Sequence, residues 1–214
     1  MGGVGSGKTT MLGDLPGVTV DIDIENGYEV LKPSDTFYVW PVKRDLSNLS
    51  QIINANFAGV DNIALDNLSE LYDCMLNQAA KVAGDKNEGI PSQREYLMIQ
   101  IKIREMLRTL FLWKKKGVNI VVNCWTQHLP IVQDDNLLRS MLIPSIGKKI
   151  PEAVCGMFSM VGHLEVGKTG NRRVRFMNDG SSPTKDRIYK RQYAPASGRA
   201  LLDGTAWQEP KKEK

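Results

Sequence analysis

The chain has 214 residues, of which 42% are hydrophobic and 24% are charged, with a formal net charge of +4. The sequence predicts no transmembrane helix and no signal peptide. A zinc site is also not expected, because the chain has only 3 widely spaced cysteines and 2 histidines. The charge is uneven: residues 1–80 hold 4 basic and 11 acidic residues, whereas residues 81–214 hold 24 and 13. The basic half suggests a polyanionic partner such as nucleic acid, a solvated lysine-rich surface being the alternative.

The predicted elements alternate between helices and strands. Apolar spacing predicts helices over residues 8–12, 46–57, 69–83 and 94–117. Alternating or continuous apolar runs predict strands over residues 18–24, 36–42, 62–68, 118–125, 157–167 and 172–179, the last two joined by a hairpin turn. The polar segment 84–93 is expected to be a mobile loop, and residues 127–150 look irregular.

This alternation predicts an α/β fold with a mainly parallel sheet flanked by helices and a C-terminal antiparallel hairpin. We expect a single domain over residues 1–205, followed by a disordered tail over residues 206–214.

The most specific motif is "GGVGSGKT", which matches the phosphate-loop pattern G-x-x-x-x-G-K-[ST] at every specified position. Glycines let backbone N–H groups converge on phosphate oxygens. Lys8 would reach the β and γ phosphates of ATP, and Thr9 would ligate Mg²⁺. A chance glycine-rich turn is the alternative. The expected nucleotide-binding residues are Gly2, Gly3, Val4, Gly5, Ser6, Gly7, Lys8, Thr9 and Thr10.

Polar residues end three of the predicted strands, where ligands bind in a parallel sheet. Asp66 ends "NIALD" and would hold Mg²⁺ together with Thr9, or else cap the next helix. Glu25 follows "VTVDIDI" and would orient water; Asp21 and Asp23 alternate with it, so at least one of the three acids should face solvent or a ligand. Gln127 ends "VNIVVNCWTQ" and would sense the γ-phosphate, or simply form a turn.

A phosphate loop usually follows a buried strand, but only Met1 precedes this one. Three interpretations are open. The chain belongs to a longer reading frame, the sheet closes without that strand, or the loop is poorly anchored and binds nucleotide weakly.

The segments "GGVGSGKTT", "DIDIENGYEVL", "NIALDNLSEL" and "NIVVNCWTQ" resemble, in this order, the core of RecA-like ATPases. That resemblance implies a catalytic glutamate at Glu25, a metal-binding aspartate at Asp66 and a coupling glutamine at Gln127. The compact size, "SQREY" and "PSIGKKIPEAV" look like the phage Sak-type single-strand annealing and recombination ATPases. A phage protein of this kind would act in the host cytoplasm.

The resemblance also assigns roles to basic residues. Two loops, at about 84–94 and 129–149, would contact single-stranded DNA, with two disordered solvent loops as the alternative. The stretch 168–191 holds 8 basic and 2 acidic residues, and its "KDR" resembles the finger by which a neighbouring subunit stabilises the transferring phosphoryl group. A basic hairpin that binds nucleic acid or solvent is the alternative. The finger residues are Lys185 and Arg187, and the expected DNA contacts are Lys86, Arg94, Arg139, Lys148, Lys149, Arg172 and Arg173.

The leading hypothesis is a RecA-like ATPase that uses ATP and Mg²⁺, binds single-stranded DNA and serves phage recombination or annealing. Expected partners are single-stranded DNA, further copies of the chain in a ring or filament, and a single-strand DNA-binding protein, but no membrane. One alternative is an annealing module that is gated by ATP with little hydrolysis. Another is a P-loop kinase for a small molecule.

Overall fold

The computed structural model describes residues 1–31, 34–83, 90–133, 136–148, 150–167 and 170–208. The chain forms two compact units. Unit 1 comprises residues 1–15, 125–144 and 151–214, and unit 2 comprises residues 16–124 and 145–150. The predictions of a single domain over 1–205 and of a disordered tail stay predictions, and residues 209–214 lie outside the described residues.

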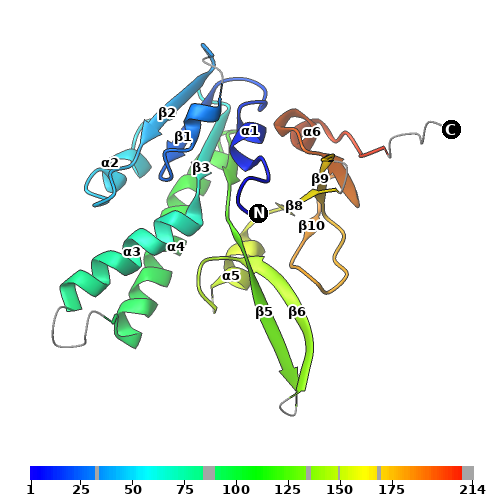
Figure 1. The fold of residues 1–214 in the computed structure, drawn as a ribbon. Helices are drawn as coiled ribbons and strands as arrows, with labels where there is room; N and C mark the ends of the chain where they lie inside the picture. The colour runs from blue at the N-terminus through cyan, green and yellow to red at the C-terminus, as the bar shows by residue number, and fades with distance from the viewer. Residues whose placement is uncertain (32–33, 84–89, 134–135, 149, 168–169, 209–214) are drawn as a thin grey trace. The chain divides into compact units, whose positions relative to one another are not determined.

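Unit 2 is built on a parallel sheet with strand order β2-β1-β3-β4 (Figure 1). Its strands are β1 (Thr19–Asp23), β2 (Phe37–Pro41), β3 (Asn62–Asp66) and β4 (Asn119–Val122). All five residues of β1 and all five of β3 are buried, as in central strands of a parallel sheet. In β1 this includes Asp21 and Asp23, whose burial the alternating pattern did not predict. The register pairs Asp23 of β1 with Asp66 of β3, so these two carboxylates lie side by side.

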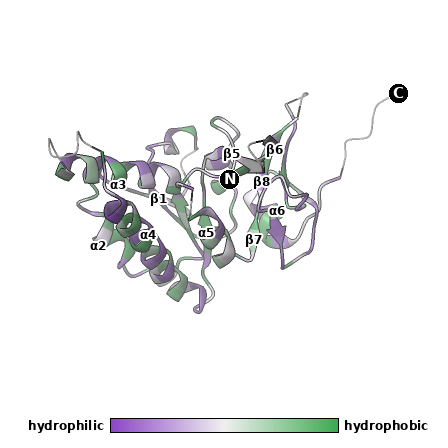
Figure 2. Cartoon of the chain, turned by 90° about the horizontal axis from the view of Figure 1, so that it is seen from below, coloured by the Kyte–Doolittle hydropathy of each residue, from purple (hydrophilic) through white to green (hydrophobic). Residues whose placement is uncertain are grey.

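Helices pack beside this sheet. They are α2 (Leu49–Ile53), α3 (Leu68–Ala83) and α4 (Gln93–Lys114), with a 3₁₀ turn η1 (Tyr28–Val30) after β1. Hydrophobic and hydrophilic residues intermix along α4 (Figure 2), which packs against α3 and β4. Its start is fixed by a capping box, in which Ser92 Oγ accepts from Glu95 N at 3.3 Å and Ser92 N donates to the Glu95 carboxylate.

Unit 1 contains a three-stranded antiparallel sheet of order β11-β9-β8, and two further strand pairs, β5–β6 and β7–β10. Leu164, Val174, Phe176 and Ala194 form its buried core. The elements are α1 (Lys8–Leu12), β5 (Thr126–Gln133), β6 (Asn136–Pro144), α5 (Pro151–Met157), β7 (Met160–Val161), β8 (His163–Val166), β9 (Arg172–Arg175), β10 (Lys185–Asp186), β11 (Tyr193–Pro195) and α6 (Gly198–Asp203).

The predicted α/β class, the parallel sheet and the C-terminal antiparallel hairpin (β8 with β9) are confirmed. Two predictions of local structure are wrong. Residues 127–150 are not irregular, because most of them form the β5–β6 hairpin, in which Thr126 pairs with Pro144. The helix expected over 46–57 is only α2, five residues long. No helix in the described residues is long and apolar enough to cross a membrane.

Candidate nucleotide site

The phosphate loop (residues 2–10) is anchored within unit 1 by strand β8. Leu164 N donates to Met1 O at 2.8 Å, and Gly2 forms a parallel bridge with Leu164. A Cβ on Gly2 would lie 2.7 Å from Ser6 Oγ and 3.2 Å from Leu164 O, so this approach requires glycine. Two residues therefore align the loop with a strand of the C-terminal sheet.

Helix α1 supplies the second anchor. Its Met11 packs against the buried core of unit 1. Gly198, the first residue of α6, lies so close that a Cβ there would be 2.4 Å from Met11 O and 2.8 Å from Leu15 N. The Ser197 hydroxyl also donates to the Asp14 carboxylate just after α1. Apolar packing and close backbone contact thus hold the C-terminal end of α1, the helix that follows the phosphate loop.

The interior of the loop fits a phosphate group. Gly5 and Gly7 have φ values of +71° and +97°, which side chains rarely permit. The Lys8 ammonium is buried and donates to Gly3 O at 2.8 Å and to Gly2 O at 3.2 Å. Ser6 Oγ is buried, and no described residue bonds to it. A buried cation and an unpaired hydroxyl are groups that a phosphate oxygen would satisfy.

Unit 2 holds an acidic cluster, which we define as Asp21, Asp23 and Asp66. All three carboxylates are buried, and both Asp21 oxygens and Asp23 Oδ2 lack a hydrogen-bond partner among the described residues. Burial, followed by the charges of Asp66 and Asp23, raises the pKa of Asp21 to about 8. Burial also raises the pKa of Asp23, although the Gly27 amide opposes that shift. Asp21 is therefore protonated at neutral pH.

Two asparagines that the sequence analysis did not select form hydrogen bonds with Glu25 and Asp66, the two carboxylates predicted to act in the site. Asn67 donates to the Glu25 carboxylate, and Asn123 Nδ2 donates to Asp66 Oδ1 at 3.2 Å. Asn123 also fixes the strand ends, since its N–H donates to Leu65 O at 3.0 Å. Its position directly after β4 was the available signal. Asp66 ends β3, as predicted. Glu25 is half-buried and lies two residues after the last residue of β1.

Gln127 does not end the strand that precedes it. That strand, β4, stops at Val122, and Gln127 lies in β5 of unit 1, where it pairs with Ile143. Its side-chain amide donates to Pro144 O at 3.3 Å. The polar residue directly after β4 is Asn123 instead. The γ-phosphate role of Gln127 stays a prediction.

A family model described as an AAA domain matches residues 1–188. The chain belongs to this family. The match spans the phosphate loop, the strands that end in Asp66 and near Glu25, and the Lys185–Arg187 segment. It identifies the chain as a nucleotide-binding protein of the ATPase type. No curated protein matches the sequence.

The segment predicted to be the finger consists of strand β10 and the start of the turn that follows it. Lys185 pairs with Val161 of β7, and Arg187 N donates to Ser159 O at 3.1 Å. Between them the Asp186 side chain is fully buried and accepts from Arg191 Nε at 2.8 Å. Arg187 is exposed, while burial and the nearby Arg187 charge lower the pKa of Lys185.

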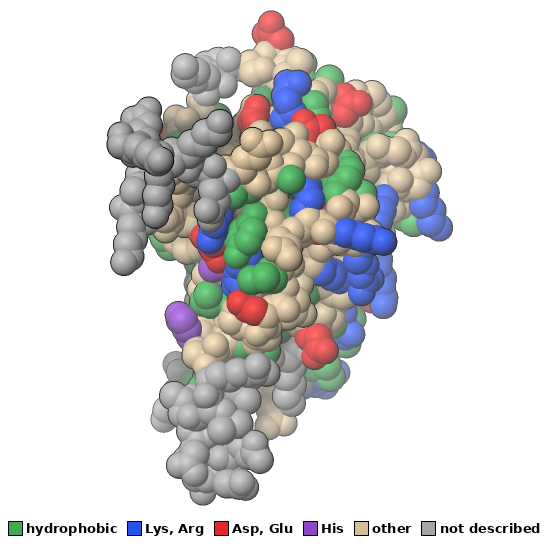
Figure 3. Space-filling model, turned by 90° about the vertical axis from the view of Figure 1, so that its right-hand side faces the viewer, with side chains coloured by type: hydrophobic (Ala, Val, Ile, Leu, Met, Phe, Trp, Pro, Cys, Tyr) green, Lys and Arg blue, Asp and Glu red, His purple; other side chains and the backbone are tan. Residues whose placement is uncertain are grey.

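The residues expected to contact DNA are spread over both units of the AAA domain. Arg94 in α4 and Lys148 are exposed in unit 2. Arg173 contacts Glu165 at 3.2 Å and stacks on Tyr193 at 4.1 Å. Figure 3 shows several lysine and arginine side chains gathered on the face that it presents. Lys86, Lys149 and the side chain of Arg139 lie outside the described residues.

The predicted Mg²⁺ ligands lie in different units, Thr9 in unit 1 and Asp66 in unit 2. Within the described residues no three histidine, cysteine, aspartate or glutamate side chains are arranged to hold a metal. Thr9 and Asp66 remain predicted ligands.

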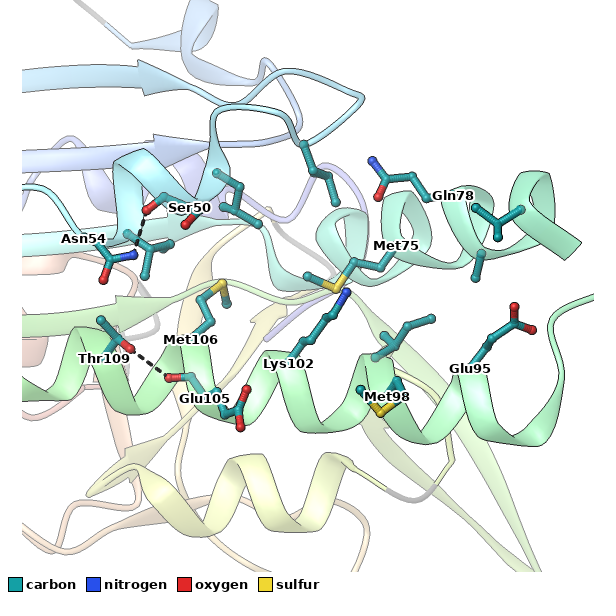
Figure 4. Close-up of a pocket in the computed structure, with 16 residues that line it drawn as sticks. Ser50, Asn54, Met75, Gln78, Glu95, Met98, Lys102, Glu105, Met106 and Thr109 are labelled. Carbon is teal, nitrogen blue, oxygen red and sulfur yellow. Dashed lines mark hydrogen bonds between the residues drawn. The ribbon is translucent and has the colours of Figure 1, made fainter.

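Unit 2 also has an open groove of about 660 Å³ between α2, α3 and α4 (Figure 4). Methionines line it from two helices, Met75 on α3 and Met98 and Met106 on α4. None of the predicted site residues that the structure describes contributes to this lining. The groove therefore gives no support to an acceptor pocket of the kind that a small-molecule kinase requires.

Proposed function

We propose that this AAA-family protein is an ATPase that binds single-stranded DNA and supports phage recombination or strand annealing, like the Sak-type proteins that its motifs resemble. The observation that carries the proposal is the phosphate loop, with the Lys8 ammonium buried against Gly2 O and Gly3 O. ATP phosphates would replace these carbonyls as partners of Lys8, because a charge-assisted bond to phosphate is stronger than one to a neutral carbonyl.

Hydrolysis requires a group that orients water. Glu25 suits this role because it lies two residues after β1, is half-exposed, and accepts a hydrogen bond from Asn67. Thr9 and Asp66 would hold Mg²⁺, which neutralises charge on the phosphate oxygens when it is bound. Asn123 orients Asp66 through its hydrogen bond. The ion pair between Asp186 and Arg191 holds the residue between Lys185 and Arg187, which supports a finger in which these two residues would act on a neighbouring copy of the chain.

Binding of single-stranded DNA is supported by charge. Residues 81–214 carry 24 basic against 13 acidic residues. Such a surface neutralises phosphates and releases counterions, so affinity should fall steeply with salt. In a ring or filament, several copies of the chain would place their basic surfaces along one DNA strand. A single-strand DNA-binding protein would deliver that DNA strand.

The test is the ATPase rate with and without single-stranded DNA at several salt concentrations, in the wild type and Glu25→Gln. We expect DNA to stimulate turnover, and Glu25→Gln to lose turnover while it keeps ATP binding. Equal turnover in that variant would remove Glu25 from the mechanism. Annealing that survives Lys8→Ala would favour the ATP-gated annealing module. Turnover that ignores DNA and needs a phosphate acceptor would favour the kinase.

A further inference from the structure

The side chain of Arg172 in β9 lies against the phosphate loop of the same unit. A Cβ built on Gly7 would lie 3.0 Å from Arg172 Nη1 and 3.3 Å from its Cζ. The guanidinium thus contacts the residue directly before Lys8. Gly7 is needed here both for its φ of +97° and because any side chain would displace Arg172.

The three arginines of β9 differ in their partners. Arg175 is buried and pairs with Glu165 at 2.6 Å, and Arg173 pairs with the same carboxylate at 3.2 Å. Arg172 is exposed, and no carboxylate in the described part of the chain forms an ion pair with it. Its charge is therefore available to an anion at the loop, whereas the other two serve the hairpin itself.

The β8–β9 hairpin fixes this arrangement at two points. Leu164 of β8 pairs with Gly2 at the start of the loop, and Arg172 of β9 contacts Gly7 near its end. The strands are in register, with Val166 opposite Arg172 and Leu164 opposite Val174. The same hairpin that aligns the loop therefore also sets the position of the arginine.

We propose that Arg172 binds the terminal phosphates of the nucleoside triphosphate held by its own chain's loop, as a second cation beside Lys8, rather than DNA. This rests on the proposed nucleotide site. A guanidinium can donate two parallel hydrogen bonds to phosphate oxygens, which an ammonium cannot. Arg172 should therefore raise the affinity of the site for a nucleoside triphosphate more than its affinity for a diphosphate.

The test measures binding of a slowly hydrolysed ATP analogue with Mg²⁺, and of ADP, by isothermal titration calorimetry. Arg172→Gln is compared with Arg172→Lys and with Arg199→Gln, which removes the same charge from an exposed position on α6 of the same unit. We expect Arg172→Gln to lower the affinity for the triphosphate analogue about tenfold or more, and to lower the affinity for ADP less. Arg172→Lys should be intermediate, Arg199→Gln unchanged, and all three should melt within a few degrees of the wild type.

Two outcomes would overturn the proposal. If Arg172→Gln binds the analogue as Arg199→Gln does, while Lys8→Ala binds it poorly, the loop is the nucleotide site but Arg172 takes no part. If Arg172→Gln instead loses affinity only for single-stranded DNA, the arginine is a nucleic-acid contact. Unchanged binding in Lys8→Ala would refute the proposed nucleotide site itself.

Discussion

Replacing Asp21 with asparagine should stabilise the protein at and above neutral pH. In the unfolded chain this carboxyl loses its proton near its ordinary pKa of 3.8, whereas in the folded chain burial raises the pKa to about 8. Between these values the unfolded state binds fewer protons, so the free energy of unfolding falls as pH rises. The loss is complete above about pH 8, where both states are ionised.

The size of the effect follows from the shift. Each pH unit in this window lowers the free energy of unfolding by up to about 1.4 kcal/mol, and thus by up to roughly 4 kcal/mol at neutral pH. Asp21→Asn removes this term, because the amide does not ionise. Because burial also raises the pKa of Asp23, the free energy of unfolding of Asp21→Asn would still fall with pH, but less steeply.

The assay is urea unfolding between about pH 5 and pH 8. The matched control is Asp35→Asn, an exposed position in the same unit. We expect the gain in stability of Asp21→Asn to grow with pH and that of the control to stay near zero. Parallel pH profiles for wild type and Asp21→Asn would refute the assignment of a protonated, buried Asp21.

Three further predictions test the anchors and the site. Gly198→Ala should lower stability by about 1–3 kcal/mol in thermal melting, since its Cβ would meet the backbone of α1, whereas Gly156→Ala, with open space around its Cβ, should not. Arg175→Met should cost about 1–3 kcal/mol in urea unfolding, because the buried Ser182 hydroxyl loses its donor and Glu165 keeps only Arg173 as an arginine partner; no loss would show that these contacts add nothing to stability. Asn123→Ala should reduce ATP turnover about tenfold with little change in nucleotide affinity, since it frees the carboxylate at the end of β3; unchanged turnover would make that bond purely structural.

Much of unit 2 was predictable because its signals are local. The alternating pattern of β1, the apolar run of β3 and the amphipathic spacing of α4 each predict the element from its own residues. The β5–β6 hairpin was missed because Pro130 interrupts the first strand and weakens its apolar pattern. The position of Gln127 was mispredicted for a different reason, because the continuous apolar run gave no sign that β4 stops at Val122.

The candidate site was predictable only in part. Glycine, lysine and threonine spacing identifies the phosphate loop by itself, and Glu25 and Asp66 follow apolar strands. The anchoring of the loop on Leu164 and the approach of Arg172 to Gly7 join segments about 160 residues apart, and no local pattern encodes them.

The central claim is that the loop around Lys8 binds ATP. Calorimetric titration of Mg²⁺–ATP into the wild type and into Lys8→Ala tests it most directly, with melting curves to confirm that both are folded. The account predicts one ATP per chain in the wild type and affinity at least tenfold lower in Lys8→Ala. Equal affinity in the two proteins, or no binding by the folded wild type, would contradict it.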